Sequence, residues 1–445
     1  MQTSFSLAQL ADPDIAEVDK ILRACVHCGF CTATCPTYVL LADEDDSPRG
    51  RIYLAKDMLE SAEPARREVV KHVDRCLSCL GCMTTCPSGV NYMHLIDHAR
   101  AYVEETYRRP FVDRLARAGL LRVMSNPRLF WWALLTALVV KPMVPLFDFV
   151  RLKRLAAVLR LAPWRLPPRP VKPGVAAARG RREGRVALLS GCVESVLAPN
   201  INKAAVQVLT RHGFEVVQVR GEGCCGALAH HMGRKQEARA AACRNIDAWF
   251  GEINAEGLDA IVTTASGCGT VIKDYGFMLR NVPAYAARAK KIAGMCCDIS
   301  EFVNNINNLE YTKRPAIKVA YHPACSLAHG QRITAVPKAM LSKAGFVLID
   351  IPESHLCCGS AGTYNILQPE LANRLRDRKI ANIDTVMPEL IAAGNIGCII
   401  QIAGGTSVPV VHPIELIDWA TGGSAPRALE RTRWSDTIGD SSRYR

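Results

Sequence analysis

With 445 residues and 49% apolar side chains, the chain is long enough for two or three domains with hydrophobic cores. Nineteen cysteines in so long a chain indicate metal ligands in a reducing compartment, and they argue against the disulfide scaffold of a small secreted domain. The net charge of +13 would suit a nucleic-acid partner, but no recognisable nucleic-acid-binding module accompanies it, so we expect none. The first ten residues lack the basic and apolar regions of a signal peptide, which predicts a cytoplasmic protein.

Residues 1–107 contain two cysteine runs with the same spacing, C-x2-C-x2-C-x3-C-P, which is typical of bacterial ferredoxins with two [4Fe-4S] clusters. Three cysteines at this spacing bring three thiolates to three irons of one cube, and the fourth iron takes the last cysteine of the other run. The runs therefore predict two crossed sets of ligands. Cluster one takes Cys25, Cys28, Cys31 and Cys86, and cluster two takes Cys76, Cys79, Cys82 and Cys35.

The stretch between the two runs favours a helical ferredoxin domain. It has 40 residues, more than a minimal ferredoxin needs, and it includes the helical pattern of Arg51 to Ala62. Zinc is the alternative metal, but structural zinc sites usually draw their ligands as two separated pairs. His27, inside the first run, could tune a cluster by hydrogen bonding, and we expect it to be exposed to solvent instead.

Residues 108–162 form a basic and apolar segment that we expect to be helical. Its longest apolar run, Leu129 to Val140, has 12 residues, whereas a helix needs about 20 to span a bilayer. One interpretation is an interfacial anchor, with basic residues toward anionic lipid and Trp131 and Trp132 at the headgroups. The other is a buried helix that packs on the ferredoxin domain or on a partner subunit. The Pro-rich linker that follows, residues 163–185, is expected to be extended and solvated.

The C-terminal half is an internal repeat, with one copy in residues 186–311 and the other in residues 312–421. In each copy a β-branched run leads to the first cysteine, a helical stretch follows, and a second such run leads to a Cys-Cys-Gly turn. The cysteines thus follow strands, at the edge where open α/β sheets bind ligands. The predicted fold is α+β and multidomain: a helical two-cluster ferredoxin domain, then two α/β Cys-Cys-Gly repeats. Residues 422–445 are expected to be a disordered tail.

Each repeat offers four thiols, which are enough for one further iron-sulfur cluster, because adjacent cysteines can serve different corners of a multi-metal cluster. The alternative is a set of buried or redox-active thiols. The first repeat supplies Cys192, Cys224, Cys225 and Cys268, and the second supplies Cys325, Cys357, Cys358 and Cys398.

The remaining cysteines and histidines of the repeats are expected to be structural. A match to the dinucleotide fingerprint, Gly221-x-Gly223-x-x-Gly226, follows the second strand of its repeat, whereas a nucleotide domain carries it after the first. We therefore expect no nucleotide or flavin site in this chain. Side chains assigned to packing or structural hydrogen bonds are Cys243, Cys296, Cys297, His230, His231, His322, His355 and His412.

The double ferredoxin run followed by two Cys-Cys-Gly repeats resembles the glycolate oxidase iron-sulfur subunit family from Cys25 to about Ala420. The phrases that carry the resemblance are RCLSCLGCMTTCPSGVNY, GEGCCGALAHHMG, ASGCGTVIKDYG and PESHLCCGSAGTYNILQPE. The resemblance implies flavoprotein partner subunits that carry FAD and oxidise glycolate to glyoxylate. It further implies that this chain passes their electrons toward a membrane quinone, at the cytoplasmic face of the inner membrane.

The Cys-Cys-Gly repeat also resembles the catalytic subunit of heterodisulfide reductase, where each repeat holds a non-cubane cluster with five cysteines. This sequence departs from that pattern, because Ala265 and Asn395 stand where the fifth cysteines would be. A site with four ligands, or an altered one, is the more cautious expectation. Other functions stay open: the equivalent subunit of a glycerol-3-phosphate or lactate dehydrogenase, a stand-alone disulfide or quinone reductase, and an iron-sulfur redox sensor.

Overall fold

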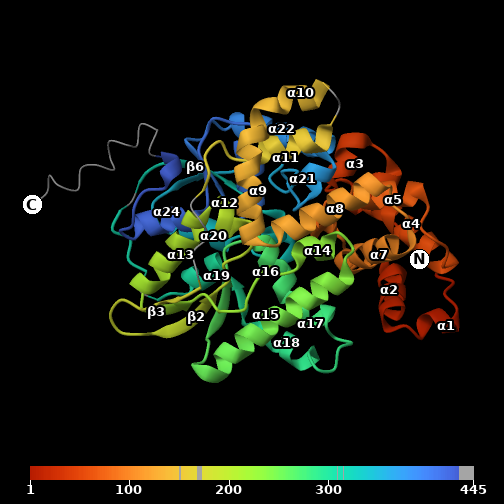
Figure 1. The fold of residues 1–445 in the computed structure, drawn as a ribbon, viewed down its shortest axis with the longest axis horizontal. Helices are drawn as coiled ribbons and strands as arrows, with labels where there is room; N and C mark the ends of the chain where they lie inside the picture. The colour runs from red at the N-terminus through yellow and green to blue at the C-terminus, as the bar shows by residue number, and fades with distance from the viewer. Residues whose placement is uncertain (150–151, 168–172, 308, 314, 430–445) are drawn as a thin grey trace, which may run out of the picture.

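The fold was analysed in a computed structural model, which describes all residues except 150–151, 168–172, 308, 314 and 430–445 (Figure 1). The N-terminal domain is helical, as predicted, and its helices enclose one hydrophobic core that includes Leu22, Leu59 and Leu95. The helix expected at Arg51 to Ala62 lies in α4, which begins one turn earlier because the Ser47 side chain accepts a hydrogen bond from the Gly50 amide. The helices are α1 (Leu7–Leu10), α2 (Pro13–Ala24), α3 (Pro36–Leu41), α4 (Pro48–Ser61), α5 (Arg67–Asp74), α6 (Gly81–Thr85) and α7 (Tyr92–Thr106).

The basic and apolar segment forms a longer helix than its apolar run indicates. Helical turns continue from Pro127 to Phe147, a stretch that is long and apolar enough to cross a membrane by length and composition. The apolar run ends at Val140, and a proline follows it at position 142. Pro142 lies in the first turn of a short 3-10 helix, where a missing amide costs little, so the helical turns continue. The elements are α8 (Phe111–Met124), α9 (Pro127–Val140), η3 (Lys141–Met143), α10 (Val144–Phe149) and α11 (Lys153–Leu161).

The end of the expected linker belongs to the first sheet. Strand β1 (Val175–Ala176) pairs antiparallel with β3 (Phe214–Val217), and β2 (Gly184–Leu188) begins before residue 186. The Trp131 indole donates a hydrogen bond to the Pro167 carbonyl, which holds the start of the linker against α9. Residues 163–185 are therefore not solvated throughout; residues 168–172 lie outside the described part of the chain.

The first repeat is a five-stranded sheet in the order β1-β3-β2-β4-β5, with every pair after β1 parallel. Its remaining strands are β4 (Ala260–Thr263) and β5 (Cys296–Asp298). Cys296 and Cys297 lie in β5, and Cys296 is buried in the core, as expected for packing residues. The helices are α12 (Glu194–Leu197), α13 (Pro199–Arg211), α14 (Ala227–His231), α15 (Lys235–Ala255), α16 (Ser266–Lys273), α17 (Tyr275–Met278), α18 (Ala286–Met295) and α19 (Ile299–Asn304).

The second repeat reproduces this order in a parallel sheet, β7-β6-β8-β9. Its strands are β6 (Lys318–His322), β7 (Val347–Ile349), β8 (Leu390–Ala393) and β9 (Val410–Val411). Its helices are the π-helical turn η4 (Ser326–Gly330), α20 (Val336–Lys343), α21 (Tyr364–Leu367), α22 (Pro369–Asp384), α23 (Ile396–Ala403) and α24 (Pro413–Ala420). A short 3-10 helix, η5 (Arg427–Leu429), ends the described chain, and its Leu429 is buried in the core of the repeats. The expected disorder is therefore wrong for residues 422–429, and residues 430–445 lie outside the described part of the chain.

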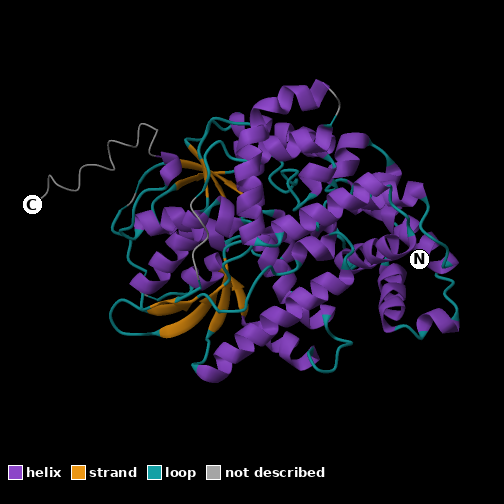
Figure 2. Ribbon diagram, in the orientation of Figure 1, coloured by secondary structure: helices purple, strands orange, loops and turns teal. Residues whose placement is uncertain are grey.

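One hydrophobic core joins the two repeats. It contains β2 and β4 residues of the first sheet and β6 and β8 residues of the second, such as Val186, Val262, Val319 and Leu390. Figure 2 shows the two sheets as separate groups of strands with helices around them. Because both sheets pack in one core, the cysteine-bearing edge of one sheet has a fixed position relative to that of the other.

Candidate iron-sulfur and thiol sites

The two cysteine runs fold alike. His27 and Ser78, each two residues after the first cysteine of its run, have positive φ values of 55° and 48°. Gly29 and Leu80, two residues further on, have positive φ values of 85° and 62°. A left-handed backbone conformation is strained for residues other than glycine. Its occurrence at equivalent positions of both runs indicates that each loop is shaped to surround a bound group.

The cysteines of the two runs surround two neighbouring cavities. One cavity is lined by Cys25, Cys28, Cys31 and Cys86, and the other by Cys35, Cys76 and Cys79, with Cys82 bordering both. Each run thus contributes its last cysteine to the other run's cavity, which is the arrangement that crossed ligation requires. The structure brings together the two expected ligand sets, and their assignment to clusters stays a prediction.

The donor chemistry of these cavities fits iron-sulfur clusters. Burial, followed by repulsion from neighbouring thiolates, raises the pKa of Cys79 and of Cys82 well above the ordinary value. Crowded thiols of this kind ionise together only when a metal compensates their charge. Two protein groups also donate to cluster-two sulfurs: the Arg51 guanidinium lies 3.8 Å from Cys35 Sγ, and the Tyr92 hydroxyl lies 3.8 Å from Cys76 Sγ.

A third cavity, of about 200 Å³, lies where the carboxyl edges of both sheets meet. The sequence suggested a separate site in each repeat, whereas the structure places both thiol sets around this one cavity. Cys192 Sγ lies 3.5 Å from Cys224 Sγ, which are 32 residues apart in the chain. The thiols that line it are Cys192, Cys224, Cys225, Cys268, Cys325, Cys357, Cys358 and Cys398.

Cys79 connects the ferredoxin domain to the third cavity. It lines both the cluster-two cavity and the third cavity, together with Leu77 and Ser78. The hydrogen bond with Cys325 lowers the pKa of Cys357, but the hydrogen bond with Cys358, burial and, to a smaller extent, the neighbouring Cys79 raise it well above the ordinary value. The three cavities are therefore consecutive, and the cavity predicted to hold cluster two lies in the middle.

Comparisons with known proteins match both halves of the chain. Residues 21–90 match the 4Fe-4S dicluster domain, and residues 186–273 and 319–403 match the Cysteine-rich domain. The chain is 42% identical over 420 residues to the glycolate oxidase iron-sulfur subunit of Escherichia coli (strain K12), covering 94% of this chain and 99% of that protein. The chain belongs to the family of glycolate oxidase iron-sulfur subunits.

More distant relatives of this glycolate oxidase iron-sulfur family member include two curated proteins and one solved structure. A probable glycolate oxidase iron-sulfur subunit of Bacillus subtilis (strain 168) is 28% identical over 90% of this chain and 94% of its own length. Lactate utilization protein A of the same organism is 25% identical, over 53% of this chain and 99% of its own length. A hypothetical protein from Helicobacter pylori of known crystal structure has a TM-score of 0.53 at 11% identity, over 94% of this chain and 74% of that one, and shares the fold.

In this family member, one of the two positions where a fifth cysteine is missing joins the repeats. Asn395 caps α23 through its Oδ1, which accepts a hydrogen bond from Gly397 N, and its Nδ2 donates to Ser266 Oγ. Ser266 in turn lies 2.7 Å from the hydroxyl of Ser326. Ala265, the equivalent residue of the first repeat, lines the third cavity without a sulfur to offer.

The glycine fingerprint also has a packing role. Gly226 has a positive φ of 88°, and a Cβ there would lie 3.0 Å from the Ala238 carbonyl of α15. The glycine therefore lets the Cys-Cys-Gly turn approach that helix closely. Glu222, inside the same fingerprint, accepts hydrogen bonds from Ser190 N and the Trp249 indole, which ties the turn to the first sheet.

The histidines singled out in the sequence divide into four groups. His412 is structural, as expected, because Nε2 lies 2.9 Å from the Thr264 carbonyl and Nδ1 accepts from Ile414 N. His27 is exposed, as expected, and His355 is exposed as well, although a structural role was expected for it. His230 and His231 both contact buried Asp97 of the ferredoxin domain. His322 is buried and has no hydrogen-bond partner among the described residues, so the expectation of a structural hydrogen bond is wrong for it.

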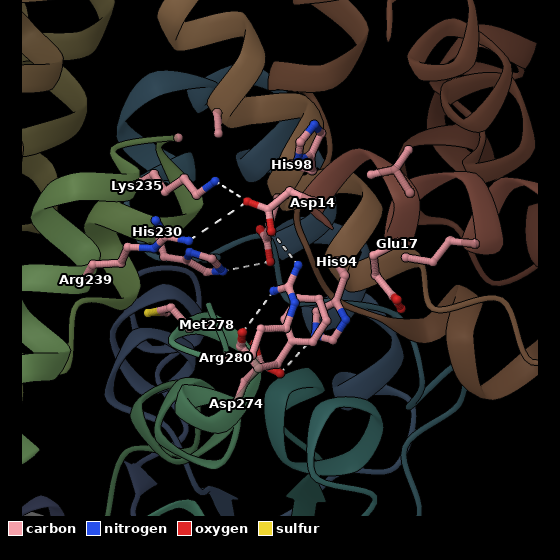
Figure 3. A pocket seen from close by; sticks show the side chains of 16 residues that line it. Asp14, Glu17, His94, His98, His230, Lys235, Arg239, Asp274, Met278 and Arg280 are labelled. Carbon is pink, nitrogen blue, oxygen red and sulfur yellow. Dashed lines mark hydrogen bonds and ion pairs between the residues drawn. The ribbon is translucent and has the colours of Figure 1, made fainter. Parts of the chain in front are cut away.

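The contact between the ferredoxin domain and the first repeat encloses a charged cavity of about 70 Å³ (Figure 3). Lys235, Arg239 and Arg280 of the repeat converge there on Asp14, at the start of α2. His94 stacks on Phe277 with ring centroids 3.4 Å apart, and its Nε2 lies 2.9 Å from Asp274 Oδ1. These contacts hold α2 and α7 of the ferredoxin domain against the first repeat.

The Asp97–His230 pair at this contact is expected to make stability depend on pH. Burial raises the pKa of Asp97, but His230, with Nε2 3.0 Å from Oδ2, outweighs burial and leaves that pKa well below its usual range. Burial lowers the pKa of His230, and Asp97 outweighs burial and raises it. The pair therefore stabilises the fold fully at pH values above the usual pKa of a carboxyl, about 4, and below the usual pKa of histidine, about 6.5. This stabilisation is lost as the pH rises from about 6.5 through the raised pKa of His230.

We expect Asp97→Asn to reduce the free energy of unfolding by about 2 kcal/mol near pH 6, and by less near pH 9, where His230 is neutral. Thermal unfolding of both proteins at the two pH values measures the difference. Asp377→Asn, a change of an exposed carboxylate on α22, is the matched control and should change neither Tm. An equal loss at both pH values would contradict the charged pair.

A hydrogen bond to a cluster sulfur favours the reduced, more negative state, so Tyr92→Phe should lower the reduction potential of cluster two. The expected shift is roughly 20–60 mV, since 59 mV corresponds to about 1.4 kcal/mol for one electron. A potentiometric titration followed by electron paramagnetic resonance (EPR) measures it. Tyr102→Phe removes a hydroxyl that bonds the Glu63 carbonyl, away from the cysteines, and should leave the potential unchanged. A wild-type potential in Tyr92→Phe would contradict the contact.

Proposed function

We propose that this chain is the electron-transfer subunit of a flavin-dependent glycolate oxidase or dehydrogenase complex. Partner flavoprotein subunits would carry FAD and oxidise glycolate to glyoxylate, and this chain would accept the electrons one at a time. The observation that supports this role best is the sequence of three consecutive cysteine-lined cavities, with Cys79 shared by the second and third. When bound, the clusters supply one-electron chemistry, and the protein holds, insulates and orders them.

Exposure of the cysteines supports a direction for the electrons. Cys28, at the first cavity, is the exposed cysteine of the nineteen, and its neighbours Val26 and Phe30 are 66% and 63% exposed. An exposed apolar patch beside a cluster suits a docked redox partner. We infer that electrons from flavin enter at cluster one, pass to cluster two, and leave toward the third cavity.

The terminal acceptor in this proposal is a membrane quinone, and the basic and apolar segment supports a membrane contact. Within residues 108–185 there are eighteen Lys and Arg residues and three acidic residues. In the most apolar 18 residues of the helix from Pro127 to Phe147, only 11% are buried. Leu134 is the buried residue of α9, and it packs against Ala162 and Val196. A helix that is packed on one face and apolar on the others suits the surface of an anionic bilayer. We therefore place the protein in the cytoplasm, peripheral to the inner membrane.

Purification of the tagged chain under anaerobic conditions tests the proposal. We expect flavoproteins to co-purify with it, and the complex to reduce an artificial dye when glycolate is added. The substrate panel includes lactate and glycerol 3-phosphate, the substrates of the alternative complexes. Turnover with one of these and none with glycolate would overturn the assignment, as would purification without a flavoprotein.

A further inference from the structure

We propose that His322 is a metal ligand, and that the second repeat holds an iron-sulfur centre with four thiolates and one imidazole. The nearest ring nitrogen of His322, Cys358 Sγ and Cys398 Sγ all lie within 4.8 Å of one another. These three side chains are buried, and the other two thiols of the set, Cys325 and Cys357, are buried beside them. The ligand set does not depend on the proposed electron-transfer function; only the role of the centre as an electron acceptor rests on it.

Both nitrogens of the His322 ring lack a hydrogen-bond partner among the described residues, and the residue is 0% exposed. Burial of a polar group without a partner is costly, and native proteins rarely leave one so. His412, also buried in this repeat, shows the contrast, because both of its nitrogens have partners. A metal ion would supply the partner that the protein does not.

The chemistry of the His322 side chain suits ligation. A neutral imidazole offers one ring nitrogen with a free lone pair, which is the donor that metals take from histidine. Lys379, the charged group near the thiols of this repeat, is engaged elsewhere, because its Nζ donates to the carbonyls of Glu353 and Ser354.

The two repeats differ at this position. His322 stands three residues before Cys325, and the residue three before Cys192 is Leu189, which is buried in the apolar core of the first repeat. Only the second repeat can therefore add a nitrogen donor from the end of its central strand. Since Asn395 is engaged in capping and in the contact with Ser266, His322 supplies the fifth donor that residue 395 does not.

The donor set favours an iron-sulfur centre over zinc. Zinc in structural sites takes four ligands, whereas this set offers five, and adjacent cysteines such as Cys357 and Cys358 can reach different irons. Cys79 of cluster two borders the same cavity, so an electron has a short path from that cluster. In that step cluster two is oxidised by one electron and the second-repeat centre is reduced by one. A neutral imidazole in place of a thiolate raises the reduction potential, which makes this centre the favoured terminal site.

The test uses the full chain, prepared anaerobically, with His322→Leu, His322→Cys and the control His355→Leu, which changes an exposed histidine of the same repeat. Iron, zinc and sulfide are counted, and potentials are followed by EPR. We expect more than the eight irons of two cubanes in the wild type. His322→Leu should lose iron from the second repeat with both cubane signals retained, and the control should match the wild type.

His322→Cys keeps a donor and guards against a variant that merely misfolds. It should retain the iron, and its centre should have a lower potential than the wild-type centre. Labelling with ¹⁵N-histidine should change the nitrogen hyperfine coupling of the wild-type centre and not that of His322→Cys. Unchanged iron and potential in His322→Leu would overturn the proposal, as would stoichiometric zinc or a wild-type centre without nitrogen coupling. None of these measurements involves glycolate, so failure of the proposed function would be seen separately.

Discussion

Cys86→Ala should abolish glycolate-dependent reduction of an acceptor and remove cluster one, although Cys86 belongs to the second cysteine run. Its side chain lines the cavity of Cys25, Cys28 and Cys31, so its loss leaves one iron of that cube without a ligand. About four of the eight cubane irons should be lost, while the EPR signal of cluster two persists. The expected loss is large because a relay fails when one member is missing.

Iron analysis and EPR of the purified variant measure this outcome. Cys243→Ala is the matched control, since Cys243 lies on α15 outside the three cavities, and it should retain both clusters and full activity. Loss of cluster two with survival of cluster one would show that each run ligates its own cube. That result would contradict crossed ligation.

Val139→Glu should release the protein from membranes. Val139 lies on α9 and is 77% exposed, so a carboxylate there adds a charge to the apolar surface without disturbing the buried face at Leu134. A charge placed in the apolar part of a bilayer costs about 2 kcal/mol or more, which predicts roughly 30-fold weaker partitioning onto vesicles. Co-sedimentation with vesicles that contain anionic lipid measures the binding.

The control for this change is Met387→Glu, which alters an 80% exposed side chain at the start of the loop before β8. It should bind vesicles as the wild type does. Dye reduction by glycolate should stay normal in Val139→Glu, because the helix is remote from the three cavities in sequence and contributes no side chain to them. Equal partitioning of both variants would instead favour a partner subunit as the occupant of this surface.

Local patterns in the sequence were sufficient to predict the ferredoxin domain and the repeat. Cysteine spacing identified which thiols share a cavity, and the alternation of β-branched runs and helical stretches placed each cysteine after a strand. Helix length could not be predicted in the same way, because a proline such as Pro142 ends a helix in most settings. In the structure Lys141 bonds the Ala162 carbonyl, a tertiary contact 21 residues away that no local pattern reveals.

The arrangement of the candidate sites depended on contacts between distant segments. The single cavity of the two repeats arises from the shared core, and its position beside Cys79 arises from the docking of α7 on the first repeat. Arg51 and Tyr92 were missed because nothing in their local sequence indicates a contact with cysteine sulfur. For His322, its place three residues before Cys325, against Leu189 in the first repeat, was the available signal; burial without a partner could be seen only in three dimensions.

The exposure of Cys28 also has a consequence for the durability of the protein. Molecular oxygen and peroxide that diffuse through the solvent would reach a cluster in the first cavity before one in the second, whose cysteines are buried or half-buried. In the proposed complex, the outermost cube would therefore be the first to be oxidised. A flavoprotein docked over Val26 and Phe30 would then also protect the subunit against oxidation.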